Sequence, residues 1–299
     1  MSDFFQQLAN GIVLGMLYAL IALGYTMVYG IIQLINFAHG EIFMIGAFGS
    51  LAVFTLLGSP DHLWVLIPMI LGGMVSSVAI AVVMERFAYR PLRHAPRLAP
   101  LITAIGVSVF LQESIRLWQG GAAKPYPSLL SGNALSIGGV TVDKTSMLIV
   151  FLAAGSMIAL DRFVATSRTG RAMRATAQDP DTARLMGIDT DRIIVIAFVL
   201  GACLAAVAGV AQGLSTGNIQ FNIGFIAGLK AFTAAVLGGI GNIRGAVVGG
   251  LLIGIIEVML TQYFPNGSAW KDVGAFAVLI LVLLLRPQGL LGERVADRA

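Results

Sequence analysis

The feature that most constrains this chain is a series of long segments without Asp, Glu, Lys or Arg. They cover residues 4–40, 42–60, 62–84, 98–112, 145–160, 193–229, 231–243, 245–256, 258–270 and 273–285. A helix rises about 1.5 Å per residue, so about 20 apolar residues cross the roughly 30 Å hydrocarbon core of a bilayer. Backbone groups in lipid must be bonded within the protein, and the alternation typical of a β-barrel is absent. The sequence therefore predicts an all-α bundle of about 8 to 10 transmembrane passes.

Composition supports this fold class. Hydrophobic residues make up 57% of the 299 residues and charged residues only 11%. An ordinary soluble domain has roughly 25% charged residues, so a soluble globule, a disordered chain and a nucleic-acid-binding protein are poor fits. The one cysteine, Cys203, lies in an apolar run, and no His, Asp or Glu spacing suggests a metal site. We expect a single transmembrane domain over residues 1–299 that binds no metal or cofactor itself.

Basic residues predict the orientation. Fourteen arginines fall where alternating passes bring them to one side: Arg86, Arg90, Arg93, Arg97, Arg162, Arg168, Arg171, Arg174, Arg184, Arg192, Arg244, Arg286, Arg294 and Arg298. The other side receives Arg116, Lys124, Lys144 and Lys271. By the positive-inside rule, the arginine-rich side is cytoplasmic. About nine passes then place the N-terminus outside the cell membrane and the C-terminus inside.

Two of the apolar runs are too long for one straight crossing. Residues 4–40 and 193–229 each hold 37 residues, or about 55 Å of helix. We expect breaks near Gly30 or within 36–41 in the first run, and within 215–218 or at Asn222, Gly224 or Gly228 in the second. The runs align at an offset of 189 residues and enter from opposite sides. This predicts inverted repeats with interrupted helices, with chance matching among Gly, Ala and Phe as the alternative.

Polar residues at membrane depth are the candidate path residues. They are Asn36, His39 and Glu41 in the first half, with Asn218, Asn222 and Lys230 in the matching part of the second. A charge in hydrocarbon is costly, so each should face the bundle interior, a partner or water. The alternative for Glu41 and Lys230 is that they pair with each other or extend to the membrane interface. Glu257 interrupts the last third of the chain.

The sequence contains no recognisable motif for ATP binding or catalysis. No Gly-x-x-x-x-Gly-Lys-Ser/Thr phosphate loop occurs, and no catalytic elbow or metalloprotease motif is present. We therefore expect a transport subunit rather than an enzyme. Its energy must come from an ion gradient, from a partner, or from no source.

The loop over residues 161–192 is the best candidate for a partner surface. Helix-favouring residues run from Gly170 to Gln178, and a second short helix is expected from Asp181 to Gly187, on either side of Pro180. Small residues at 172, 175 and 177, with Met173, offer a contact face. An ordinary solvated loop whose arginines only set the topology is the alternative.

Three motifs resemble one transporter family. They are Ile35-Asn36-Phe37-Ala38-His39-Gly40-Glu41, the segment from Gly170-Arg171-Ala172-Met173-Arg174-Ala175 to Gly187-Ile188-Asp189, and the run Ala235–Gly245. Together they resemble the permease subunits of bacterial branched-chain amino acid ABC transporters, most of all the shorter of the two sister permeases. The resemblance covers nearly the whole chain.

The resemblance implies a multi-pass subunit of the bacterial inner membrane. In that membrane, the orientation predicted from the arginines places the N-terminus in the periplasm and the C-terminus in the cytoplasm. The partners of the subunit would be the sister permease in a heterodimer, two cytoplasmic ATPase subunits that use the ATP, and a periplasmic amino-acid-binding protein. The loop would dock on an ATPase through Gly170, Arg171, Arg174, Ala175, Asp179, Arg184 and Gly187. A permease for urea or short-chain amides is one alternative. An ion-coupled secondary transporter using Glu41, Lys230 and Glu257 is another, and a passive channel is a third.

Overall fold

The computed structural model describes residues 2–60, 62–93, 95–96, 98–130, 132–137 and 139–292, without the side chains at 2 and 137. Arg97, Arg294 and Arg298 lie outside the described residues. The helices are α1 (Ser2–Ile32), α2 (His39–Leu56), α3 (Leu66–Met84), α4 (Leu98–Gln119), α5 (Lys144–Thr166), α6 (Arg168–Gln178), α7 (Pro180–Leu185), α8 (Thr190–Thr216), α9 (Ile223–Gly238), α10 (Ile243–Tyr263) and α11 (Gly267–Leu285). Short helical turns are η1 (Leu63–Val65), η2 (Glu85–Tyr89) and η3 (Arg90–Leu92). The strands are β1 (Lys124–Pro125), β2 (Asn133–Ile137), β3 (Val140–Asp143) and β4 (Asn218–Ile219).

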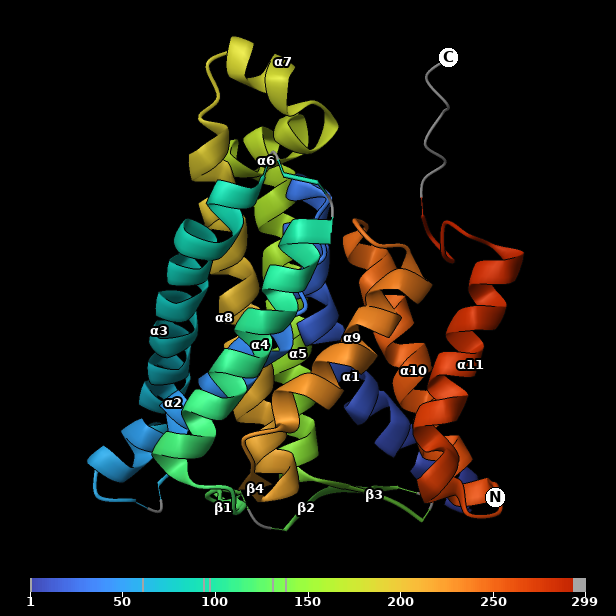
Figure 1. Cartoon of the computed structure of the whole chain (residues 1–299). Helices are drawn as coiled ribbons and strands as arrows, with labels where there is room; N and C mark the ends of the chain where they lie inside the picture. The colour runs from blue at the N-terminus through green and yellow to red at the C-terminus, as the bar shows by residue number, and fades with distance from the viewer. Residues whose placement is uncertain are drawn as a thin grey trace.

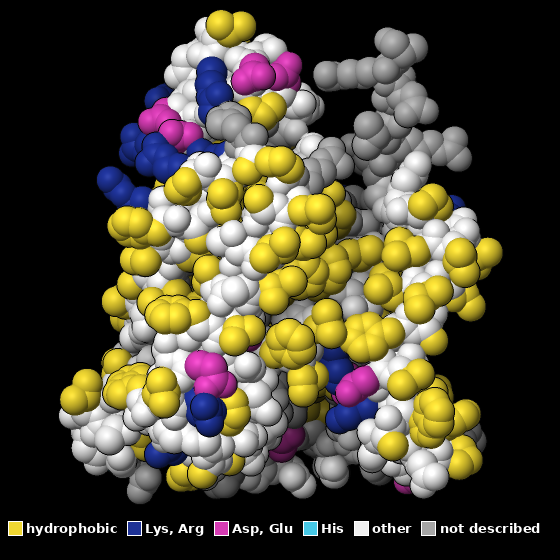
Figure 2. All heavy atoms as spheres, in the orientation of Figure 1, with side chains coloured by type: hydrophobic (Ala, Val, Ile, Leu, Met, Phe, Trp, Pro, Cys, Tyr) yellow, Lys and Arg dark blue, Asp and Glu magenta, His cyan; other side chains and the backbone are white. Residues whose placement is uncertain are grey.

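The helices form a bundle with two distinct ends (Figure 1). Eight of the described helices, counting α3 together with its flanking turns, are long and apolar enough to cross a membrane, and α9 is a shorter apolar helix. We call the end that carries α6 and α7 the inner end and the end that carries the strands the outer end. Figure 2 shows a broad hydrophobic band between them, with Lys and Arg gathered at the inner end. The prediction of a polytopic helical bundle is confirmed.

Helices α1 to α3 and α8 to α10 share one plan in opposite directions. Helix α1 runs from the outer to the inner end, the chain breaks, and α2 returns; α8 and α9 repeat this from the inner end (Figure 1). Thr216 follows Ile32 by 184 residues, and Ile223 follows His39 by the same number. The repeat is therefore inverted as expected, but the offset of 189 is wrong. The offset of 189 came from matches among Gly, Ala and Phe residues, which recur throughout the chain. The positions of the two helix breaks give an offset of 184.

The two breaks have different chemistry. Helix α8 ends at Thr216 and is followed by Gly217, whose φ of 67° gives the left-handed cap that glycine adopts without strain. Helix α1 ends at Ile32, and Gln33 has a φ of 52°. Gly30 stays inside α1, so the expected break at that residue is wrong. The expected break within 36–41 lies where the chain enters α2.

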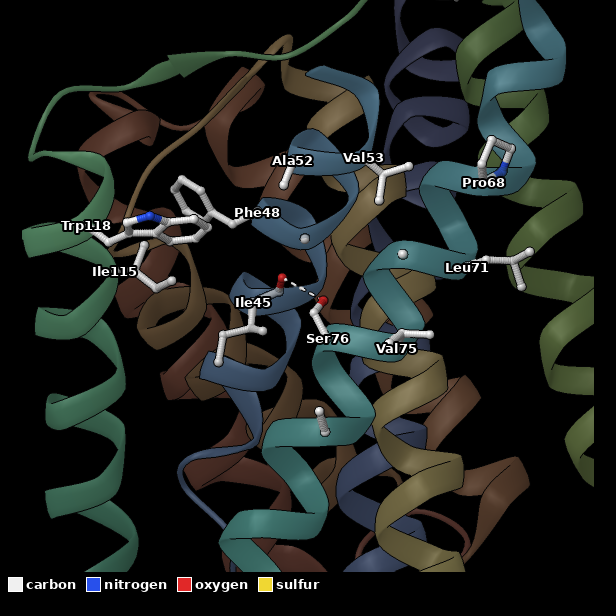
Figure 3. A pocket seen from close by; sticks show the side chains of 13 residues that line it. Ile45, Phe48, Ala52, Val53, Pro68, Leu71, Val75, Ser76, Ile115 and Trp118 are labelled. Carbon is white, nitrogen blue, oxygen red and sulfur yellow. Dashed lines mark hydrogen bonds between the residues drawn. The ribbon is translucent and has the colours of Figure 1, made fainter. Parts of the chain in front are cut away.

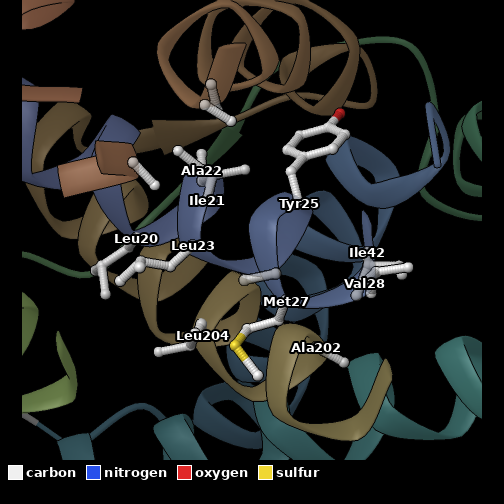
Figure 4. Close-up of a cluster of buried hydrophobic side chains, with 14 of the residues drawn as sticks. Leu20, Ile21, Ala22, Leu23, Tyr25, Met27, Val28, Ile42, Ala202 and Leu204 are labelled. Atoms are coloured by element: carbon white, nitrogen blue, oxygen red, sulfur yellow. The ribbon is translucent and has the colours of Figure 1, made fainter. Parts of the chain in front are cut away.

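The core forms where α1 and α8 cross. Leu20, Leu23 and Met27 of α1 pack near Ala202 and Leu204 of α8 (Figure 4). Glycines let the backbones approach: a Cβ placed on Gly254 of α10 would lie 2.2 Å from the Gly15 nitrogen of α1. Small residues drive helix association in lipid in this way, because packing replaces the hydrophobic effect there. The interrupted helices are thus held between α1, α8 and α10.

Two short antiparallel pairs cover the outer end, β1 with β4 and β2 with β3. Lys124 pairs with Ile219, which ties the loop after α4 to the end of α8. Tyr126 inserts beside this pair, with its hydroxyl 2.6 Å from Ser50 Oγ of α2, and a Cβ on Gly213 of α8 would lie 2.8 Å from its ring. Burial raises the pKa of this phenol, so it stays neutral. These strands are not among the elements predicted from the sequence.

Candidate functional site

Asn36 lies in the break between α1 and α2. Its side chain is buried, and its Oδ1 accepts a hydrogen bond of 2.8 Å from the Tyr89 hydroxyl of η2. The amide nitrogen has no hydrogen-bond partner among the described residues. Asn36 therefore joins the break to the inner end of α3 and keeps one donor unused.

His39 is the first residue of α2 and is fully enclosed. Its ring packs edge-on against Tyr25 of α1, with ring centroids 4.8 Å apart. A Cβ on Gly24 would lie 2.0 Å from His39 Nε2, so this glycine makes the space for the imidazole. Nε2 has no hydrogen-bond partner within the described part of the chain. The histidine thus fills a glycine-made recess between α1 and α8.

Glu41 stands in the first turn of α2 and is 0% exposed. Its Oε1 accepts a hydrogen bond of 3.1 Å from Ser108 Oγ of α4. Its Oε2 has no hydrogen-bond partner among the residues described and faces Gly224, where a Cβ would lie only 2.5 Å away. Gly224 is the second residue of α9, so the carboxyl group of Glu41 lies in the first turn of one interrupted helix and against the first turn of the other.

A glycine seam joins these two helix starts. A Cβ on Gly40 would lie 2.2 Å from the Gly224 carbonyl oxygen and 2.9 Å from the Gly228 Cα. Neither α2 nor α9 has a side-chain hydrogen bond at its N-cap, which is Ala38 in one case and Asn222 in the other. The N–H groups of a first helical turn carry partial positive charge. Two helix starts without a side-chain cap therefore meet inside the bundle, with the carboxyl group of Glu41 beside them.

Lys230 does not pair with Glu41 and does not extend to the membrane interface. Its Nζ lies 2.7 Å from Glu257 Oε1 of α10 and 2.7 Å from Asp272 Oδ1 of α11, and Lys230 and Glu257 are both buried. The Tyr18 hydroxyl of α1 donates to Glu257 Oε2 at 2.8 Å. Both alternatives considered for Glu41 and Lys230 are therefore wrong. The reason lies in the tertiary structure, because Lys230 lies on the side of α9 that packs against α10 and α11.

The remaining asparagines lie toward the outer end. Asn218 is exposed and belongs to β4, whereas Asn222 directly precedes α9 and is two residues from Gly224. The structure therefore brings Asn36, His39, Glu41 and Asn222 to the two helix starts. It separates Asn218 and Lys230 from them. Within the described residues, no three His, Cys, Asp or Glu side chains are grouped as a metal site.

A groove on the outside of the bundle contains none of the candidate path residues. It has a volume of about 590 Å³ and lies between α2, α3 and α4 (Figure 3). Figure 3 shows Phe48 and Trp118 on one side and Leu71 and Val75 on the other. The Ser76 hydroxyl is directed inward, to the carbonyl oxygen of Ile45. This wall is apolar, as a surface that faces lipid should be.

The loop at the inner end forms two short helices, as predicted. Helix α6 begins at Arg168, two residues earlier than expected, because Ser167 caps it by accepting from the Gly170 nitrogen at 2.8 Å. Asp179 caps α7 by accepting from the Asp181 and Thr182 nitrogens. Gly187 ends the unit with a φ of 81°. Pro180 is the first residue of α7, a position where its missing N–H costs nothing.

The expected contact face of α6 is directed inward. Met173 is buried, and Ala172 and Ala177 pack against the core, with Ala175 partly covered. A Cβ on Gly170 would lie 2.3 Å from the carbonyl oxygen of Val164 in α5. The small residues thus seat α6 on its own bundle, because they are the ones that allow close approach. That part of the prediction is wrong.

Two side chains that the sequence did not single out stand free instead. Leu185 and Met186, at the end of α7, are 87% and 79% exposed. Arg184 beside them donates to Thr190 Oγ1 at 2.7 Å, and Arg171 and Arg174 donate to carbonyl oxygens of the last turn of α5. Asp191, at the start of α8, pairs with Arg90 and Arg93 beyond α3. The signal for Leu185 and Met186 was an apolar pair in the middle of a polar loop.

The chain is similar to known proteins over most of its length. The family model described as "Branched-chain amino acid transport system / permease component" matches residues 7–283. The chain is 48% identical over 302 residues to the high-affinity branched-chain amino acid transport system permease protein BraD of Pseudomonas aeruginosa, covering 99% of this chain and 98% of that protein. It is 48% identical to the permease protein LivH of Escherichia coli K12, covering 99% and 97%. The solved structure of PsaBC from Streptococcus pneumoniae in complex with Fab shares the fold, with a TM-score of 0.50, 12% identity and coverage of 93% and 91%.

Proposed function

The chain belongs to the family of permease components of branched-chain amino acid transport systems, and from this premise we propose that it forms the path by which an ABC importer moves branched-chain amino acids across the bacterial inner membrane. Two ATPase subunits at the inner end supply the energy. A sister permease completes the membrane unit, and a periplasmic binding protein delivers substrate at the outer end. Residues 161–192 form the coupling segment.

The observation that supports the path most directly is the meeting of the α2 and α9 starts. Half-helix N-termini inside transporters favour the carboxylate of an amino acid substrate. Around these starts, Asn36, His39 and Glu41 hold buried polar atoms without a hydrogen-bond partner among the described residues. Buried polar atoms are normally paired, so unpaired ones suit a polar guest or water. We place the passing zwitterion here, with Asn222 and then Asn218 toward the outer end.

Coupling follows from the build of α6 and α7. Helix α6 is fixed to the last turn of α5, and the chain after α7 is fixed through Asp191 to the end of α3. A force applied at Leu185 and Met186 is therefore transmitted to both α5 and α3. Binding of ATP closes the ATPase pair, the bundle opens toward the binding protein, and hydrolysis resets it. Gly170, Asp179 and Gly187 give the segment its shape, and the arginines hold it in place.

Uptake by the whole complex in vesicles tests the function. We expect leucine, isoleucine and valine to compete for uptake that stops when ATP is depleted and continues when the ion gradients are collapsed. Urea and acetamide should not compete. Uptake that follows the ion gradient would support a secondary transporter, and flux that needs neither source would support a channel. Competition by urea would support the amide permease.

Variants test the path and the coupling segment. Asn36→Ala with His39→Ala should lower uptake about 5- to 160-fold, since two lost hydrogen bonds at about 0.5–1.5 kcal/mol each amount to about 1–3 kcal/mol, while the complex stays assembled. Unchanged uptake would remove these residues from the path.

Leu185→Asp with Met186→Asp should weaken co-purification of the ATPases. Leu135→Asp in β2, a substitution of the same kind at an exposed leucine of the outer end, should leave co-purification intact.

A further inference from the structure

A second groove lies between α5 and α10 at the inner end. It has a volume of about 400 Å³, and the side chains of Met157, Ile158, Val247 and Val248 form its apolar walls. Ile158 is 61% exposed, so the groove is open toward the surroundings of the bundle. Both helices belong to the membrane-crossing set. The groove therefore opens onto the leaflet next to α6.

The inner end of this groove is charged. Arg162 lies in the last two turns of α5, Arg244 is the second residue of α10, and Asp161 lies beside them. The described part of the chain offers none of these three side chains an ion pair or a hydrogen bond. Arg162 and Arg244 are exposed, whereas Asp161 is half-buried. The local charge is thus one net positive unit at the mouth of an apolar groove.

We propose that this groove binds an anionic phospholipid of the cytoplasmic leaflet, with its phosphate between Arg162 and Arg244 and an acyl chain along the apolar walls. Basic pockets between transmembrane helices on the cytoplasmic side bind such headgroups. Free phosphate would use only the charged end. The net positive charge of the site favours phosphatidylglycerol over phosphatidylethanolamine. Phosphatidylglycerol carries one net negative charge, and its hydroxyl groups can donate to Asp161. Phosphatidylethanolamine is neutral overall because its ammonium group adds a positive charge.

The site adjoins the coupling segment. Arg174 donates to carbonyl oxygens of Val164 and Ala165, which lie within one turn of Arg162. Gly170 packs on the same turn of α5. A lipid held at Arg162 therefore supports the helix turn on which α6 is seated. This inference goes beyond the transport function and depends on it only for the assignment of the leaflet.

Lipid binding by the purified complex tests the site. The complex is washed free of lipid, and phosphatidylglycerol is titrated back in detergent, with phosphatidylethanolamine and inorganic phosphate as separate probes. Arg162→Gln and Arg244→Gln should each weaken phosphatidylglycerol binding about fivefold, and the double variant about 25-fold, since a basic residue at the surface contributes about 1 kcal/mol. Arg86→Gln, the loss of another exposed arginine at the inner end, should leave binding unchanged.

The outcomes separate the sources. Equal binding of phosphatidylethanolamine, or competition by inorganic phosphate, would overturn the assignment to an anionic lipid. Unchanged binding in the double variant would overturn the site. Occupation of the groove by a partner subunit would appear as a crosslink from position 158 to that subunit and would also overturn it. A parent complex that binds phosphatidylglycerol but shows no ATP-driven uptake of branched-chain amino acids would count against the proposed function alone.

Discussion

At the scale of single residues, the charge cluster around Lys230 dominates. A buried charge without its partner is expensive, so removing one member costs more than the pair contributes. Lys230→Met should lower the free energy of unfolding by about 3–5 kcal/mol, because it removes the buried partner of Glu257 and leaves only the exposed Lys271 near that carboxylate. Thermal unfolding of the purified protein measures this loss.

Lys271 provides the matched control. It also approaches Glu257 Oε1, at 3.7 Å, but its side chain is 41% exposed. Lys271→Met should cost less than about 1 kcal/mol, as for other exposed ion pairs. Glu257→Gln should restore most of the stability lost in Lys230→Met. If the Lys230 and Lys271 variants unfold alike, burial does not decide the strength of this cluster.

The glycine seam gives a second prediction at this scale. Gly40→Ala should destabilise the protein by about 1–3 kcal/mol and reduce uptake, since the new methyl group meets the backbone of α9. Gly106→Ala in α4 is the control, because a Cβ there meets nothing within 4 Å. It should stabilise the helix by about 0.5–1 kcal/mol. Equal effects on thermal unfolding would contradict the seam.

At the scale of elements, α7 depends on one residue. The Asp179 carboxylate accepts from two backbone nitrogens and from the Thr182 hydroxyl, and α7 is only six residues long. Asp179→Ala should cost about 1 kcal/mol of local stability, with faster hydrogen exchange in α7 and lower ATP-driven uptake. Asp179→Asn keeps the cap and should behave like the parent. Fast exchange in both variants would point to the charge instead.

The elements also show how far the sequence could lead. Run lengths and turn residues predicted the interrupted helices and the pair α6–α7, because both depend on local chemistry. The partner of Lys230 was not predictable, since Glu257 and Asp272 come from other helices and only packing brings them together. The inward face of α6 was mistaken for the same reason: small residues suit any close contact, with a partner or with the chain's own α5. Leu185 and Met186 stand out in the sequence as an apolar pair in a polar loop, but only the structure shows that both are exposed.

At the scale of the whole molecule, the inner end should face the cytoplasm. Arginine-rich segments lie at this end, as the positive-inside rule requires. In a Cys203→Ser background, a cysteine at position 218 should react with a membrane-impermeant maleimide in spheroplasts. A cysteine at position 184 should react only in inside-out vesicles. The reverse pattern would invert the proposed topology.

The segment after α11 is joined to the end of α9 by backbone hydrogen bonds. The Leu290 and Leu291 nitrogens donate to the carbonyl oxygens of Leu237 and Gly238, both at 2.9 Å. The carboxy-terminal tail and the interrupted helix must therefore travel together during the transport cycle. A fluorophore attached at residue 292 should therefore move with α9. Its emission would follow, in real time, each opening of the bundle toward the binding protein.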